Sequence, residues 1–135
     1  MTSYIFRKDE KLCSQKIIGE MFLTGNPFLC YPLKALWLNL AEISTPYAAK
    51  TAFAVSKKNF KRAHDRNRIR RMMRESYRYL KSILYKFLEL NGQKIALMII
   101  YVGKGEPEFH QVESAMTKVI YRLEQEIKTG IKKRR

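Results

Sequence analysis

The sequence contains few residues of the kinds that hold metals or form disulfides. Its 135 residues include two cysteines and two histidines. Cys13 and Cys30 have no metal-ligand spacing, and we interpret both as free thiols. His64 and His110 lie far apart, and no acidic or cysteine residues gather around both. These shortages argue against a zinc centre, a disulfide framework and a nuclease with its own catalytic side chains. We therefore expect no catalytic residue and no metal ligand in the chain.

The chain also lacks a long hydrophobic run. Its apolar stretch from Ile95 to Val102 has the length of a strand, well short of the roughly 20 residues that cross a membrane. The first twelve residues are rich in charge and are followed by no apolar segment, unlike a signal peptide. Gly103 and Gly105 do not begin a phosphate-binding loop. We expect a cytoplasmic protein with no membrane partner.

Acidic residues are scarce compared with basic ones. The chain has 27 Lys and Arg against 12 Asp and Glu, a formal net charge of +15, and this excess predicts a polyanionic partner. Residues 57–81 hold 11 basic and 2 acidic residues, so 11 minus 2 leaves +9 in this one segment. The footprint of the partner is expected there.

Hydrophobic periodicity predicts an α+β fold in a single domain, residues 1–135, with a flexible basic tail at 130–135. We expect a first helix between Ser14 and Gly25, a strand over 28–40 broken near Pro32, and a hairpin-like connection to a second strand at 51–55. A long central helix begins near residues 62–66 and ends at Asn91-Gly92. A central strand over 94–102 and a last helix ending at Gly130 complete the order. Both long helices are expected to pack on one face of the sheet.

The central helix begins with a row of arginines. Arg66, Arg70 and Arg74 recur every four residues, opposite or adjacent to an apolar stripe that includes Ile69 and Met73. Like charges at this spacing repel unless an anion neutralises them. Arginine binds phosphate oxygens in pairs and also stacks on unpaired bases, which favours folded RNA as the partner. Asp65 and Glu75 are expected to be local charge partners rather than general acids.

The same segment carries a specific resemblance. Residues 53–58 (FAVSKK), followed by residues 61–71 (KRAHDRNRIRR), resemble the signature of the bacterial ribonuclease P protein component, with Arg66-Asn67-Arg68 at its centre. The resemblance spans roughly residues 12–123 and implies a two-layer αβββαβα sandwich with a left-handed βαβ crossover, an exception to the usual right-handed rule.

This resemblance also implies a function. The family's RNA subunit removes the 5′ leader of precursor tRNA, with Mg²⁺ bound mainly by that RNA, and the protein helps to hold the RNA. The residues matching the surface for the ribonuclease P RNA are Lys57, Lys58, Lys61, Arg62, Arg66, Asn67, Arg68, Arg70, Arg71 and Arg74. The positions matching its cleft for the single-stranded leader are Ile18, Phe22, Leu36, Trp37 and Ser56.

Several alternatives stay open. The family often has an aromatic residue where this chain has Ile18, and it has a glycine where this chain has Asn59-Phe60. Core packing is the favoured reading of Phe22 and Trp37 taken alone, and Ser56 and Asn67 are also common in caps and turns. A structural ribosomal protein is the second hypothesis. A DNA-binding regulator fits less well because no short helix precedes the central one to form a helix-turn-helix pair, so we expect no DNA partner.

Overall fold

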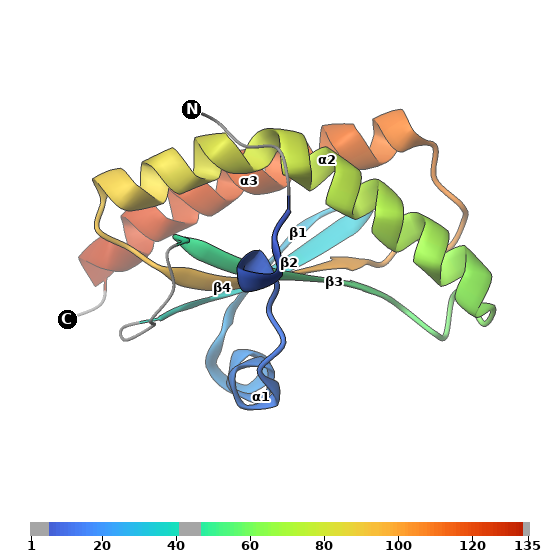
Figure 1. The fold of residues 1–135 in the computed structure, drawn as a ribbon, viewed down its shortest axis with the longest axis horizontal. Coiled ribbons are helices and arrows are strands. Elements are labelled where there is room, and N and C mark those ends of the chain that lie inside the picture. Colours follow the sequence, from blue (N-terminus) through green and yellow to red (C-terminus); the bar gives the residue numbers. More distant parts are fainter. Residues whose placement is uncertain (1–5, 41–46, 134–135) are drawn as a thin grey trace.

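The computed structural model describes residues 6–40 and 47–133. In chain order its elements are the 3₁₀ helix η1 (Lys8–Glu10), α1 (Gln15–Thr24), β1 (Asn26–Cys30), β2 (Leu33–Asn39), β3 (Ala49–Val55), α2 (Ala63–Leu90), β4 (Ile95–Tyr101) and α3 (Phe109–Lys133). Apart from η1, this is the expected αβββαβα order. Figure 1 shows α2 and α3 lying side by side over one face of the sheet, with α1 on the opposite face.

The ends of α1 follow from two residues next to it. The Oγ of Ser14 accepts a hydrogen bond from the backbone N–H of Ile17 at 3.3 Å, which caps the first turn. Gly25 ends the helix by donating its N–H to the carbonyl of Met21. A Cβ at position 25 would lie 2.4 Å from that carbonyl oxygen, so this close approach requires glycine. Both boundaries were predicted correctly.

The sheet has the strand order β1-β2-β4-β3. β1 and β2 form an antiparallel hairpin that turns at Tyr31-Pro32, where the break was expected, and the peptide bond between these residues is cis. β4 is antiparallel to β2 and parallel to β3. The predicted hairpin between β2 and β3 was therefore wrong, because β4 lies between them; residues 41–46 of that connection lie outside the described residues. β4 is almost wholly buried, because α2 and α3 cover one of its faces and α1 covers the other.

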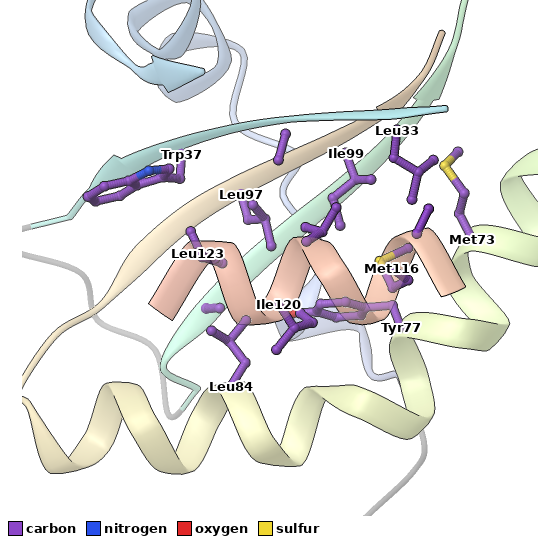
Figure 2. Packing of buried hydrophobic residues seen from close by; sticks show 14 of the residues in the cluster. Leu33, Trp37, Met73, Tyr77, Leu84, Leu97, Ile99, Met116, Ile120 and Leu123 are labelled. Atoms are coloured by element: carbon purple, nitrogen blue, oxygen red, sulfur yellow. The ribbon is translucent and has the colours of Figure 1, made fainter. Parts of the chain in front are cut away.

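The main core lies between the sheet and the two long helices. It includes Trp37 and Leu97 from the sheet, Met73 and Tyr77 from α2, and Leu123 from α3 (Figure 2). α2 joins β3 to its parallel neighbour β4, and the left hand of this crossover stays an expectation from the resemblance. α3 continues past Gly130 to Lys133, so the predicted end of this helix was wrong. One glycine costs a helix only about 1 kcal/mol.

A second, smaller core lies on the opposite face of the sheet, beneath α1. It contains Leu12, Met21, Leu36, Leu38, Ala96 and Met98. Alternation along β2 sends Leu36 and Leu38 to this face, and it sends Ala35 and Trp37 to the main core. The N-terminal segment runs along β3, where the N–H of Leu12 donates to the carbonyl of Thr51 at 3.0 Å. The two faces of the sheet therefore have different covers, and the β3 edge joins them.

Candidate nucleic-acid interface

The predicted RNA-binding residues form a continuous segment at the end of β3 and the start of α2. We call them the basic face: Lys57, Lys58, Lys61, Arg62, Arg66, Asn67, Arg68, Arg70, Arg71 and Arg74. Eight of the ten are exposed, while Arg66 and Arg70 are half-buried. Ile69 and Met73 lie between residues of the basic face in the sequence, and both are fully buried against the sheet. One side of α2 therefore packs into the core, and the adjacent side contributes residues to the basic face.

Arg66 shapes the loop that leads into α2. Its guanidinium donates to the backbone carbonyls of Phe60 at 2.8 Å and Lys61 at 2.9 Å. The ring of Phe60 is buried, and its centroid lies 5.8 Å from that of Tyr101. Arg66 therefore fixes the loop onto the core as well as adding charge to the basic face.

Asn67 and Asp65 orient neighbouring arginines. The side-chain oxygen of Asn67 accepts a hydrogen bond from the guanidinium of Arg70. The guanidinium of Arg68 lies 3.8 Å from the carboxylate of Asp65 and also pairs with Glu106 on the β4–α3 loop. Glu75 pairs with Arg78 at 2.5 Å. The expectation that Asp65 and Glu75 are local charge partners is confirmed.

Arg71 and Arg74 are exposed cations in the helical part of the basic face. Neither side chain forms an ion pair with a residue of 6–40 or 47–133. Lys81, in contrast, belongs to the same basic segment of sequence but is buried against Glu10. The basic face therefore does not extend along α2 to Lys81.

The predicted leader-binding residues lie on both faces of the sheet. Ile18 packs against the small core that contains Leu36, and Phe22 is one turn further along α1. Ser56 follows the end of β3 and is half-buried. Extending the alternation of β3 by one residue places it on the face of Ala52. We call Ile18, Phe22, Leu36 and Ser56 the α1-side surface.

Phe22 is not a core residue, although core packing was the favoured reading. Its side chain is 63% exposed, while the adjacent Met21 is completely buried. A step of about 100° around the helix separates the two, so Met21 faces the sheet and Phe22 faces solvent. The structure therefore leaves a phenyl ring free to contact a ligand on the α1 side.

Trp37 does not join the α1-side surface. It is buried in the main core, and its indole N–H donates to the carboxylate of Glu126 on α3 at 3.3 Å. Figure 2 shows it on the same side of the sheet as Leu97 and Leu123. Because Leu36 and Trp37 are consecutive residues of one strand, they face opposite ways, and the sheet separates Trp37 from Phe22.

Lys34 is a candidate that the sequence reasoning missed. It lies two residues before Leu36 on β2 and pairs in register with Ile100 of β4 and Leu29 of β1. Lys34 is exposed, and Leu29 is 55% exposed. The period-two spacing of Lys34 and Leu36 was the available signal, since it places both on one face.

No group of three His, Cys, Asp or Glu side chains in residues 6–40 and 47–133 is arranged to hold a metal ion. Within the same residues, no helix combines the length and the apolar character that a membrane span requires.

Comparison with known proteins identifies the family. The family model described as Ribonuclease P matches residues 6–124. The ribonuclease P protein component of Porphyromonas gingivalis is 33% identical over 116 residues, covering 86% of this chain and 84% of that protein. The one from Chlorobium phaeobacteroides is 29% identical over 126 residues, covering 87% and 86%.

Solved structures show the same fold. The RNase P protein of Staphylococcus aureus superposes with a TM-score of 0.68 at 17% identity, covering 84% of this chain and 94% of that chain. The RNase P protein of Thermotoga maritima gives 0.66 at 17% identity, covering 84% and 96%. The expected α+β sandwich is confirmed. With a family model matching most of its length, this chain belongs to the ribonuclease P protein family, whose members are components of an endoribonuclease.

Proposed function

We propose that the basic face binds the ribonuclease P RNA, and that the α1-side surface holds the single-stranded 5′ leader of precursor tRNA. Binding at both surfaces assists removal of the leader, which forms the mature 5′ end of the tRNA. One observation carries the proposal: ten polar and cationic residues lie on one continuous segment that leads into α2. The buried side of α2 anchors this segment to the core.

The contacts within the basic face support binding to phosphate. Asn67 holds the guanidinium of Arg70, and Arg66 fixes the preceding loop through two carbonyls. A guanidinium group that is already held in place loses less conformational entropy on binding two phosphate oxygens than a mobile one does. The exposed Arg71 and Arg74 add charge, and neutralisation of RNA phosphates by such groups releases counterions. RNA binding through this face should therefore be strong and sensitive to salt.

The α1-side surface has the chemistry that an unpaired strand requires. The exposed ring of Phe22 offers a stacking platform for a nucleobase. Ile18 and Leu36 form the apolar floor of the surface. Lys34 lies on the same face of the sheet and can contact backbone phosphate. Ser56 lies immediately before Lys57, so a strand passing over β3 would meet the basic face next.

Catalysis in this proposal belongs to the RNA subunit, and the protein supplies binding. By resemblance to the family, Mg²⁺ is held mainly by that RNA. The described side chains do not fit a carboxylate cage for the ion, and no step is assigned to a metal on the protein. We place the complex in the cytoplasm, where precursor tRNA is processed.

Reconstitution tests the proposal. The purified protein is combined with a bacterial ribonuclease P RNA and precursor tRNA at low Mg²⁺, and release of the intact 5′ leader is measured. We expect cleavage at the mature 5′ end to be stimulated, with no cleavage by the protein alone. Tight RNA binding without stimulation would instead indicate a structural or general RNA-binding protein. Cleavage by the protein alone would contradict the assignment of catalysis to RNA.

A further inference from the structure

A hollow of about 510 Å³ opens at the end of the molecule where β4 leads into α3. Its walls come from the β1–β2 turn, the β4–α3 loop and the first turns of α3. The side chains that matter for its chemistry are Tyr31, Lys104, His110, Gln111, Ser114 and Lys118. None of them belongs to the basic face or the α1-side surface. The volume lies within the range of about 300–1,000 Å³ typical of small-molecule sites.

The β4–α3 loop that forms one wall is held in place on two sides. The hydroxyl of Tyr101 donates to the carbonyl of Gly105 at 2.6 Å. A Cβ at Gly103 would lie 2.6 Å from the same hydroxyl oxygen, so the loop passes closer to Tyr101 than a larger residue would permit. On the other side, the amide of Asn59 donates to the carbonyl of Gly103 at 3.4 Å. The wall is therefore built before any ligand arrives.

The hollow is coupled to the basic face. Asn59 belongs to the loop that carries Lys57, Lys58 and Lys61, and it contacts the β4–α3 loop directly. Glu106, the acidic residue of the lining, is paired with Arg68 of the basic face. Figure 1 shows this orange loop beside the start of α2. With Glu106 neutralised, Lys104 and Lys118 leave the hollow positively charged.

We infer that this hollow binds one unpaired nucleotide of an RNA whose neighbouring phosphates lie on the basic face. The ring of Tyr31 is 66% exposed at the rim and offers a stacking surface for a base. Lys104 and Lys118 lie where they can bind its phosphate, and His110, Gln111 and Ser114 present hydrogen-bonding groups to base or sugar. The inference rests on the proposed RNA-binding function and adds a nucleotide site to it.

Direct titration of the full chain tests the inference. Amide resonances of Gly103, Gly105 and Ser114 are followed by NMR while millimolar AMP or UMP is added, and sodium phosphate is titrated separately. We expect nucleotides to shift these resonances saturably and more tightly than phosphate. Tyr31→Ala and Lys118→Ala should each weaken nucleotide binding about tenfold, consistent with the loss of one stacked ring or one phosphate contact.

Matched variants separate this site from the rest of the molecule. Tyr121 is equally exposed, at 66%, and lies on α3 outside the lining, so Tyr121→Ala should leave nucleotide binding unchanged. Arg74→Ala should weaken RNA binding and leave the mononucleotide titration intact. Equal affinity for phosphate and nucleotide, or no shifts at the three reporters, would overturn the nucleotide site. Loss of RNA binding through the basic face is measured separately, so the two proposals can fail independently.

Discussion

The carboxylate of Glu10 lies 2.5 Å from the Nζ of Lys81, and both side chains are buried. The same carboxylate oxygen accepts a hydrogen bond from the hydroxyl of Tyr85 at 2.6 Å. Its second oxygen accepts from the backbone N–H of Arg7 at 2.7 Å. These contacts fasten the N-terminal segment to the second half of α2, beyond the basic face.

Breaking this pair from one side should destabilise the fold. Glu10→Gln or Lys81→Met leaves one buried partner without its counter-charge, which typically costs about 3–5 kcal/mol. We expect each single variant to lower the free energy of unfolding by at least about 2 kcal/mol in urea titrations. The double variant should lose less than the sum of the two. Glu113→Gln, at an exposed site on α3, is the control. Additive losses in the double variant would contradict a coupled pair.

Stability should fall at alkaline pH because of buried tyrosines. Burial raises the pKa of Tyr77 above its ordinary value of 10, and burial together with the nearby Tyr77 raises the pKa of Tyr85. In the unfolded chain both hydroxyls ionise near pH 10, whereas in the folded protein they keep their protons. The unfolded state therefore loses protons first, so this contribution is complete below about pH 10 and declines above it.

Urea titrations from about pH 9 to about pH 11 measure this decline. Tyr77→Phe removes one of the two groups and should make the decline shallower, although it also removes the 2.8 Å hydrogen bond from Thr51. Tyr121→Phe, at an exposed position, should leave the decline as it is. An unchanged slope in Tyr77→Phe would show that this hydroxyl does not control alkaline unfolding.

RNA affinity should depend on Arg74 through charge. We expect Arg74→Ala to weaken binding to ribonuclease P RNA and to reduce the slope of log affinity against log salt by about 1. The free energy of unfolding should change by less than about 0.5 kcal/mol, because the side chain is exposed. Lys86→Ala removes an exposed cation from a later turn of the same helix and serves as control. Equal slopes for all three proteins would count against the basic face.

Phe22 and Trp37 should separate leader binding from stability. Phe22→Ala is expected to preserve stability within about 0.5 kcal/mol, since the ring is exposed. It should weaken binding of precursor tRNA about tenfold, with no effect on mature tRNA, which lacks the leader. Trp37→Ala should cost about 3–5 kcal/mol and leave the leader affinity of the folded protein unchanged. The reverse pattern would place the leader on the other face of the sheet.

Local features were predictable from the sequence because the interacting groups are close along the chain. The Ser14 cap, the end of α1 at Gly25 and the start of α2 each depend on residues within one or two turns. The basic face is also continuous in sequence, so its position followed from the motif and the helix period. Alternation along β2 explains why Leu36 and Trp37 lie on opposite faces, although the resemblance matched both to one cleft.

Tertiary structure decided which face each group would meet. Alternation alone could not show that α1 packs on the face of the sheet that contains Leu36. Nor could it show that the side chain of Phe22 would stay exposed. Three features join segments that are far apart in the chain. β4 inserts between β2 and β3, Glu10 pairs with Lys81 across 71 positions, and the hollow brings Tyr31 near Lys118. Such contacts arise from the competition of whole elements for burial, which a local pattern does not contain.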